Sequence, residues 1–386
     1  MIIKKISYVA VALLVMTGCA QNSPESPVRN DVKCSPYSRS LEEGLKAADV
    51  LFSKMSGDAT RSVSRQVKSV EVINRSTRSD SPESAFYIVN YEDNSGFALL
   101  SADKRLEPVF GISEEGQLSL SDTISNKPLA WYIRKIEKVA DEVVSSVNAP
   151  VTEGMDTVIT PKEPDLVVVI SWPLIDSRWN KSILAKFHQR SPYNKYCFTA
   201  DGKQALVGCG PLAAGTVMGF YEWPESYKGY TFDWAAMKAD GNHDGWARLF
   251  GWIGGPGNMN AMYGEDATGT YEHMFIPMFR NFGYKDMHNV DFTIEGANSE
   301  LKNGKPLVVS GYDDGKSAGH AWIIDGAQYI EKSLSVETPR SRTCYYHCVW
   351  GWGGKNNGSF IFSSGISVNS YIFGDMGYVA NLNKNM

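Results

Sequence analysis

Three short runs of aromatic and β-branched residues in the first half of the chain predict β-strands. They are "AFYIVNY" (85–91), "GFALLSA" (96–102) and "EPVFGIS" (107–113), separated by "EDNSG" and "ADKR", which are typical of turns. Such short connections favour an antiparallel meander. A helix is expected before these strands, and apolar residues at helical spacing predict another at 128–147, which begins with a proline suited to a first helical turn.

The second half of the chain alternates between helical and strand patterns. "GCGPLAAGTVMGFYEW" (208–223) predicts a helix, because Pro211 suits its first turn and Pro224 ends it. "HAWIIDG" (320–326) and the residues around "YYHCVW" (345–350) read as strands. Helices and antiparallel strands together indicate an α+β fold.

The N-terminus has the layout of a targeting segment. Residues 1–19 carry two lysines, an apolar stretch of about ten residues and then small residues, which is typical of a secretory signal and too short for a spanning helix. The ending "VMTGCA" is similar to the bacterial lipoprotein box, in which Cys19 would be lipidated; a plain signal peptide is the alternative. We therefore expect an exported protein at the outer membrane, the cell surface or the periplasm, with release after activation as a further option.

Composition also divides the rest of the chain. Residues 20–38 are rich in Ser, Pro and Asn and read as a flexible tether, and 151–168 carry prolines and acids without a helical period, which marks a linker. We predict one domain at 39–150 and a second at 169–386. Every histidine lies at residue 188 or beyond, so the chemistry belongs to the second domain.

Charge and cysteine spacing exclude several classes of partner. The net charge is −5 and no long basic run is present, so neither nucleic acid nor an anionic membrane surface is expected as a partner; a membrane contact would come only through the lipid anchor. The six cysteines form no CxxC pair and no cluster with histidines, so we expect no metal and no cofactor. Cys344 and Cys348 would lie about 13 Å apart in a strand, too far for a disulfide.

Cys209 is the candidate for chemistry, although a small buried residue at a tight turn would fit the same pattern. It stands between Gly208 and Gly210 at the start of a predicted helix, where the macrodipole favours a thiolate. A nucleophilic cysteine also needs a base. His320 is favoured, since it lies between a glycine-bounded turn and a strand, whereas the other histidines fit solvated or hydrogen-bonded roles.

Four motifs in this order resemble the streptopain family of papain-like cysteine peptidases. They are "HQRSPYN" (188–194), "VGCGPLA" (207–213), "GHAWIIDGA" (319–327) and "WGWGGKNNGSF" (350–360). The resemblance implies a papain-like peptidase domain preceded by an inhibitory propeptide domain of antiparallel sheet and helices. It also implies a zymogen that acts on protein or peptide substrates, is inhibited by its own propeptide and is activated by cleavage within 151–168.

The resemblance also implies roles for particular residues. Cys209 matches the nucleophile, His320 the general base, and Gln189 the glutamine whose amide joins the Cys209 N–H in the oxyanion hole. Trp350 and Trp352 match tryptophans that flank the histidine. Aligning "WN" differently would place Lys181 at the position of the glutamine.

One position departs from the family pattern. The family has an asparagine directly before "WGWGG" that orients the histidine ring, and here Val349 stands there, which cannot accept a hydrogen bond. Two functions follow as hypotheses. The first is an exported cysteine endopeptidase made as a zymogen; the alternative is a catalytically impaired homologue that binds peptides or proteins as a lipoprotein.

Overall fold

The structure is a computed structural model of the 386-residue chain. It describes residues 37–55, 65–74, 84–124, 126–146, 167–170, 175, 182–239, 243–312, 319–332, 341–363 and 375–383. The predictions for the signal segment, the lipidation site Cys19, most of the tether, the linker at 151–166 and Lys181 lie outside these residues.

The α-helices of the described residues include the three that were predicted, one before the first strands, one at 128–147 and one within 208–223. The helices are α1 (Leu41–Met55), α2 (Lys127–Ser146), α4 (Cys209–Tyr221), α5 (Trp234–Lys238), α6 (His243–Gly254), α7 (Phe275–Asn281) and α8 (Ile294–Lys302). Local sequence sets several of these ends. Ser40 and Glu43 form a capping box at α1, with the Ser40 N–H donating to Glu43 at 2.8 Å and the Glu43 N–H donating to the Ser40 hydroxyl at 3.2 Å. The Asn126 side chain accepts from the Leu129 N–H at 3.2 Å and caps α2.

Eleven strands in the described part of the chain form one sheet. They are β1 (Val67–Asn74), β2 (Ser84–Tyr91), β3 (Phe97–Ser101), β4 (Val109–Ser113), β5 (Val167–Ile170), β8 (His288–Asp291), β9 (Leu307–Tyr312), β10 (Gly319–Lys332), β11 (Ser341–Val349), β12 (Gly358–Ser363) and β13 (Met376–Ala380). The order is β1-β2-β3-β4-β12-β11-β10-β9-β13-β8, and β5 pairs with β10. The short strands β6 (Ser226–Tyr227) and β7 (Tyr230–Thr231) form a separate hairpin. The predicted meander is confirmed as β2, β3 and β4, and the α+β class is confirmed with it.

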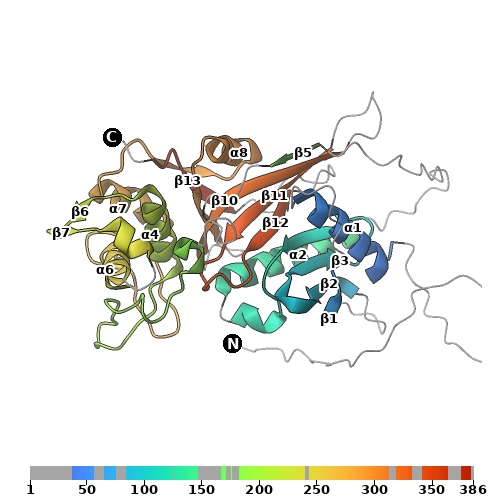
Figure 1. Ribbon diagram of the computed structural model, residues 1–386, viewed down its shortest axis with the longest axis horizontal. Coiled ribbons are helices and arrows are strands. Elements are labelled where there is room, and N and C mark those ends of the chain that lie inside the picture. The colour runs from blue at the N-terminus through green and yellow to red at the C-terminus, as the bar shows by residue number, and fades with distance from the viewer. Residues whose placement is uncertain are drawn as a thin grey trace, which may run out of the picture.

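The sheet runs without a break from the N-terminal region (residues 37–146) into the C-terminal region (residues 167–383). Strand β4 pairs antiparallel with β12 through Ile112 and Ser359 and through Gly111 and Phe360. Gly111 is required at this junction, because a Cβ there would lie 2.5 Å from the Phe360 ring. Figure 1 shows β1–β3 of the N-terminal region on one side of β12 and the long strands β10 and β11 on the other.

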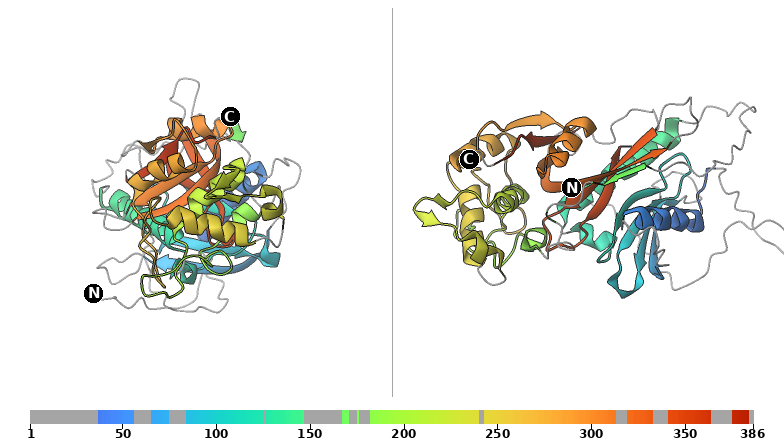
Figure 2. Two further views of the ribbon diagram at one scale, coloured as in Figure 1. Left: turned by 90° about the vertical axis from the view of Figure 1, so that its left-hand side faces the viewer. Right: turned by 45° about the horizontal axis from the view of Figure 1, so that its top comes forward.

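The two faces of β10 pack against helices from different regions of the chain. Ala321 and Ile323 belong to the hydrophobic core around α4 and α6, whereas Trp322 and Ile324 belong to the core that contains α2. This alternation follows from the two-residue period of a strand. The views in Figure 2 show the helices around α4 at one end of the molecule and the N-terminal region at the other, with the sheet between them.

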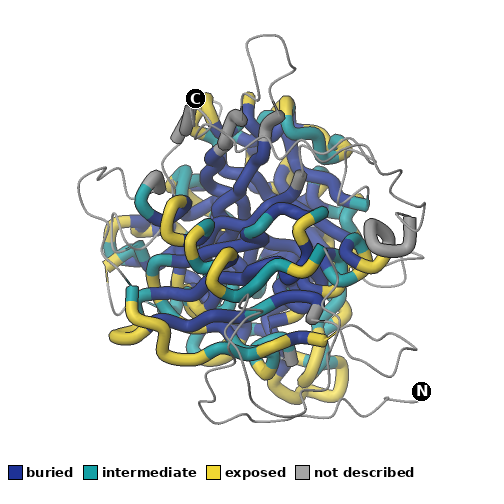
Figure 3. The backbone as a smooth tube through the Cα atoms, turned by 90° about the vertical axis from the view of Figure 1, so that its right-hand side faces the viewer, coloured by how far each residue is buried: buried dark blue, intermediate teal, exposed yellow. Residues whose placement is uncertain are grey.

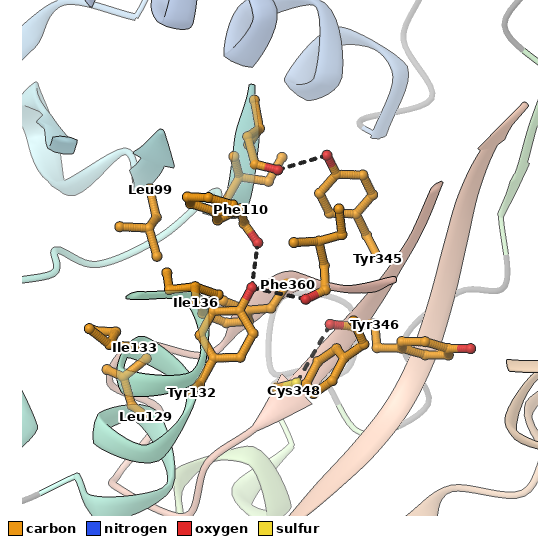
Figure 4. Close-up of a cluster of buried hydrophobic side chains, with 14 of the residues drawn as sticks. Leu99, Phe110, Leu129, Tyr132, Ile133, Ile136, Tyr345, Tyr346, Cys348 and Phe360 are labelled. Atoms are coloured by element: carbon orange, nitrogen blue, oxygen red, sulfur yellow. Dashed lines mark hydrogen bonds between the residues drawn. The ribbon is translucent and has the colours of Figure 1, made fainter. Parts of the chain in front are cut away.

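The core between the N-terminal region and the sheet is built from aromatic side chains. Tyr132 of α2 lies in contact with Trp350, Phe360 and Phe362, with ring centroids 6.2, 5.1 and 5.5 Å from its own. Its hydroxyl lies 2.8 Å from the Phe110 carbonyl and 3.0 Å from the Ile361 carbonyl, as Figure 4 shows. Figure 3 shows mostly buried residues in the interior of the molecule and exposed residues on its surface. The two regions therefore share one core.

Candidate active site

Cys209 is the first residue of α4, as the sequence predicts. Gly208 caps the helix with φ of +93°, a conformation that favours glycine. A Cβ on Gly208 would lie 2.9 Å from the Thr268 methyl group, and one on Gly210 would lie 2.5 Å from the Thr270 hydroxyl. In this structure the two glycines are therefore explained by the close approach of the chain at 268–270.

The Cys209 thiol is surrounded by backbone N–H groups but is largely desolvated. Burial raises the pKa of the Cys209 thiol, and hydrogen bonds from the backbone N–H groups of Ala321 and Gly210 offset only part of this effect. Burial therefore opposes the thiolate that the sequence predicts from the helix macrodipole.

Gln189 lies directly beside the nucleophile candidate. Its side-chain oxygen accepts a hydrogen bond from the Gly208 N–H at 3.1 Å, and its carbonyl accepts from the Val207 N–H at 3.0 Å. The side chain is buried, with 7% exposed. Because the oxygen is bound to Gly208, the amide nitrogen is the end that can donate to a substrate.

His320 is the second residue of β10, and the next residue contacts Cys209. Ala321 and Cys209 line the same small cavity, and the Ala321 backbone lowers the pKa of the Cys209 thiol, so the start of β10 and the start of α4 meet at the candidate site. The cross-strand partner of His320 is Gly311 of β9. His320 is half-buried.

The N-terminal region packs against the same pair of strands. Trp131 of α2 is completely buried, its indole N–H donates to the Tyr312 carbonyl at 2.9 Å, and its ring lies 5.1 Å from that of Trp322. A Cβ on Gly311 would lie 2.7 Å from the Trp131 ring. Trp131 therefore covers the strand directly opposite His320.

Trp350, Trp352 and Val349 have different surroundings. Trp350 is buried, and its ring contacts Trp322 at 5.6 Å and Tyr132 at 6.2 Å. Trp352 is partly buried against the same core. Val349 is buried, with 3% exposed, and pairs with Ile323 on the α4 side of the sheet. At this position an apolar side chain fills a core.

The tryptophan turn is fixed from both regions of the chain. The Asn357 side chain accepts from the Trp350 N–H at 3.1 Å and donates to the Ala185 carbonyl at 3.0 Å. Asn356, at φ of +62°, donates to the Gln117 carbonyl at 3.0 Å and lies 3.3 Å from the side-chain amide of Asn126. The turn therefore connects the candidate site with the N-terminal region.

The space beside the Cys209 side chain is almost closed. A cavity of about 10 Å³, lined by Leu212, Ala321, Val349 and Trp350 among others, adjoins Cys209, and it is about the smallest volume that can hold one water. A larger cavity of about 780 Å³ lies at the junction of the two regions and shares no described lining residue with it. Space for a peptide at Cys209 therefore requires rearrangement.

The other histidines in the described residues have structural surroundings. His347 Nδ1 lies 2.5 Å from Asp325 Oδ1 in a buried pair, and Asp325 Oδ2 accepts from the Ile175 N–H at 2.7 Å. His188 and His243 pack edge-on against Tyr193 with centroids at 5.0 and 5.5 Å. The contacts of His347 and His188, which also accepts from the Arg190 N–H at 3.4 Å, agree with the hydrogen-bonded roles expected for them.

The described part of the chain has neither a cluster of metal-binding side chains nor a helix that could span a membrane. No group of three or more His, Cys, Asp or Glu side chains is placed to hold a metal ion there. No helix among those residues is both long enough and apolar enough to cross a membrane. Cys197, Cys209, Cys344 and Cys348 are free, so the prediction that Cys344 and Cys348 do not pair is confirmed.

Glu272 is a feature of the site that the sequence did not reveal. Its carboxylate accepts hydrogen bonds from the hydroxyls of Ser310 and Tyr312 on β9 and lies next to Gly377 on β13. The surrounding letters "TYEHMF" carry no motif, and its neighbours come from positions more than thirty residues away. No local pattern could have identified it.

Family models match both regions of the chain. Residues 187–360 match the Peptidase C10 family, and residues 34–138 match the Spi protease inhibitor family. The first segment includes the residues of the candidate site, and the second includes the first part of α2, with Trp131 and Tyr132.

Individual relatives agree with this division. The chain is 23% identical over 406 aligned positions to streptopain from Streptococcus pyogenes, covering 92% of each sequence. It is 25% identical over 317 positions to the thiol protease/hemagglutinin PrtT of Porphyromonas gingivalis, covering 72% of this chain but only 34% of that larger protein. A fragment of prointerpain A from Prevotella intermedia has a similar fold, with a TM-score of 0.57, 20% identity, and coverage of 82% of this chain and all of the fragment.

Proposed function

We propose that Cys209 and His320 form the catalytic pair of this chain. The chain belongs to the Peptidase C10 family of streptopain-like cysteine peptidases and carries a Spi-type inhibitor propeptide. The observation that carries this proposal is the small cavity that Cys209 and Ala321 both line, which brings the nucleophile next to the residue that follows the base. The enzyme is a cysteine protease made as a zymogen.

The chemistry follows from these two side chains. His320 takes the thiol proton, and the Cys209 sulfur attacks the peptide carbonyl carbon. The protonated imidazole gives that proton to the leaving amine as the C–N bond breaks, which leaves a thioester. Water, deprotonated by His320, then hydrolyses the thioester and regenerates the thiol.

Gln189 is proposed as an oxyanion-hole donor. The hydrogen bond from the Gly208 N–H holds its side-chain oxygen, so the amide N–H groups are left to face the developing oxyanion together with the Cys209 backbone N–H. Trp350 and Trp352 are proposed to shield the catalytic pair from water after the propeptide leaves.

Inhibition by the propeptide is proposed to act through α2. Trp131 and Tyr132 fill the core behind β10 and Trp350, and the Cys209 side chain has almost no adjoining space. In this state burial disfavours the thiolate of Cys209, and the cavity beside it is too small for a peptide. Cleavage within 151–168 and departure of the propeptide would release both constraints.

The decisive experiment incubates the purified full-length chain with casein under reducing conditions, from mildly acidic to neutral pH. The expected result is self-shortening together with casein cleavage. Cys209→Ala should stay full-length, whereas the matched control Cys197→Ala, which changes another buried free cysteine, should still mature. Maturation of Cys209→Ala without added protease would contradict the assignment of the nucleophile.

A second candidate function rests on Val349. Without an orienting asparagine the chain would be a catalytically impaired homologue that binds peptides or proteins. Val349→Asn discriminates between the two. For an active peptidase we expect no large gain in kcat, because Val349 fills an apolar core next to Ile323. A rise from near zero would favour the impaired homologue.

Export and lipid anchoring are proposed from the sequence of residues 1–19. The chain would then reach the outer membrane, the cell surface or the periplasm with a lipid on Cys19. Labelling of bacteria that express the chain with a palmitate analogue should mark the wild type and leave Cys19→Ala unmarked. Equal absence of label in both would support a plain signal peptide.

A further inference from the structure

The cavity of about 780 Å³ at the junction of the two regions has walls of opposite charge. One wall comes from the propeptide and the other from the peptidase. Among the described lining residues, the peptidase wall carries the cations Lys186 and Lys355 and no carboxylate. The propeptide wall carries no Lys or Arg among those residues, and its carboxylates are Glu71, Glu114, Glu115 and Asp122. The two regions therefore face each other here with complementary charge.

The two lysines lie side by side on the surface of the peptidase. A Cβ on Gly354, the residue before Lys355, would lie 3.7 Å from the Lys186 Cγ. Both lysines are exposed. Among the described residues neither forms an ion pair. Their charges can therefore attract an anionic partner.

The propeptide shows which kind of chain fits opposite the lysines. Ile112 of β4 pairs antiparallel with Ser359 of β12, and the acidic pair Glu114 and Glu115 follows directly after this strand. Both glutamates line the cavity together with the two lysines. In the full-length chain an extended segment followed by carboxylates thus already lies against this side of the peptidase.

Asp122 brings a carboxylate into contact with the same turn. Its Oδ2 lies 3.4 Å from the Asn356 side-chain nitrogen, and Asn356 directly follows Lys355. A carboxylate of the propeptide therefore contacts the turn that carries one of the two lysines.

The lysines are also close along the chain to residues of the proposed site. Lys186 precedes Gln189 by three residues, and Lys355 follows Trp352 by three. Three residues span at most about 11 Å, which limits how far the backbone of each lysine lies from the site. The cavity that the lysines line shares no described lining residue with the small cavity beside Cys209. The lysines therefore lie near the reacting groups but outside them.

We propose that Lys186 and Lys355 form a binding site on the released peptidase for acidic segments of protein substrates, at a distance from the scissile bond. The inference rests on the proposed function. In the full-length chain the propeptide carboxylates line the same cavity, and departure of the propeptide leaves both ammonium groups to the substrate. Because this site lies outside the reacting centre, it places no restriction on the residues at the scissile bond.

The test compares two fluorogenic peptides with the same scissile sequence on the self-matured enzyme. One carries a glutamate tail and the other a glutamine tail, joined on either side of the cut by a Gly-Ser spacer of about four residues, which spans up to about 14 Å. The glutamate tail should lower KM by about 3- to 10-fold with kcat unchanged, because exposed ion pairs are weak and bind substrate and transition state alike. The advantage should disappear at about 0.5 M salt, which screens exposed charges.

The variant that tests the site is Lys186→Gln/Lys355→Gln, in which the two peptides should have the same KM. Lys228→Gln/Lys285→Gln is the matched control, since it removes the same charge from two exposed lysines that line neither cavity. The control should keep the preference for the glutamate tail. Equal KM for both peptides in the wild type, or a preference that persists in Lys186→Gln/Lys355→Gln, would overturn the lysine site and leave the peptidase intact.

A measurement without turnover separates this site from the proposed function. Fluorescence anisotropy reports binding of the two labelled tails to the Cys209→Ala chain after an added protease has cut its linker. Preferential binding of the glutamate tail that is lost in Lys186→Gln/Lys355→Gln, with no cleavage of either peptide by the wild type, would support the lysine site and contradict the peptidase.

Discussion

Tyr132 offers a direct measure of how strongly the propeptide holds the peptidase. Its hydroxyl lies within hydrogen-bond distance of the Phe110 carbonyl, in the propeptide, and of the Ile361 carbonyl, in the peptidase. Burial keeps the pKa of Tyr132 well above its ordinary value, so the group stays a neutral donor at any working pH. Tyr132→Phe removes this bridge and keeps the ring contacts.

The expected cost follows from the loss of a buried donor. Removing one partner of a buried hydrogen bond costs about 1–3 kcal/mol, which is about a 5- to 150-fold change in an equilibrium constant. Tyr132→Phe removes the contact between the propeptide and the Ile361 carbonyl, so it weakens the closed form. The equilibrium between the closed, inhibited form and the open, active form therefore shifts towards the open form. Self-shortening of the full-length chain should therefore start at least about five-fold sooner.

The matched control is Tyr91→Phe. Tyr91 is equally buried in the propeptide, but its hydroxyl has no hydrogen-bond partner in the described structure, so its removal should change the rate less than two-fold, an order-of-magnitude expectation from the same principle. The assay is a gel time course of self-shortening, repeated as thermolysin susceptibility in a Cys209→Ala background. Unchanged maturation in Tyr132→Phe, or equal acceleration in both variants, would refute the reasoning.

Three further predictions concern the site and its support. Gln189→Glu should lower kcat by about 10²- to 10³-fold with little change in melting temperature. The reason is that a carboxylate still accepts from the Gly208 N–H but cannot donate to an oxyanion. A kcat equal to that of the wild type would show that Gln189 is not part of the oxyanion hole. Alkylation of Cys209 in the full-length chain should be slow at pH 7 and accelerate only above the ordinary pKa of cysteine, because burial raises the pKa of its thiol. Peptide mapping after iodoacetamide treatment measures this rate. Fast labelling of Cys209 at pH 7 would contradict the prediction. Asp325→Asn should destabilise the chain by about 3–5 kcal/mol in urea unfolding, because it breaks the buried pair with His347; a loss below about 1 kcal/mol would show that the pair contributes little.

The elements that could be predicted are those whose signal is local. Strands β2, β3 and β4 have aromatic and β-branched residues bounded by turn chemistry, and α4 begins at a glycine and ends before Pro224. The sequence therefore placed Cys209 correctly at the start of α4. Strand β1 (Val67–Asn74) was not predicted, since it is an edge strand with mostly exposed or half-exposed positions and no clear alternation.

The features that could not be predicted depend on contacts between distant segments. The contact between Asn126 and Asn356 joins residues 230 positions apart, and the pairing of β4 with β12 joins the same two regions. The pKa of Cys209 is set by burial under neighbouring elements, which no residue in "VGCGPLA" encodes. Glu272 belongs to the site only because β9 and β13 place Ser310 and Gly377 beside it.

The junction between β4 and β12 has a consequence for the mature enzyme. Only two residue pairs join these strands, yet they close the side of β12 that faces away from β11. Once the propeptide is gone, Ser359 and Phe360 present unpaired backbone groups along a strand that also carries Ile361 and Phe362. Exposed strand edges of this kind recruit other strands, so the proposed departure of the propeptide would leave an edge open to pairing that β4 protects in the full-length chain.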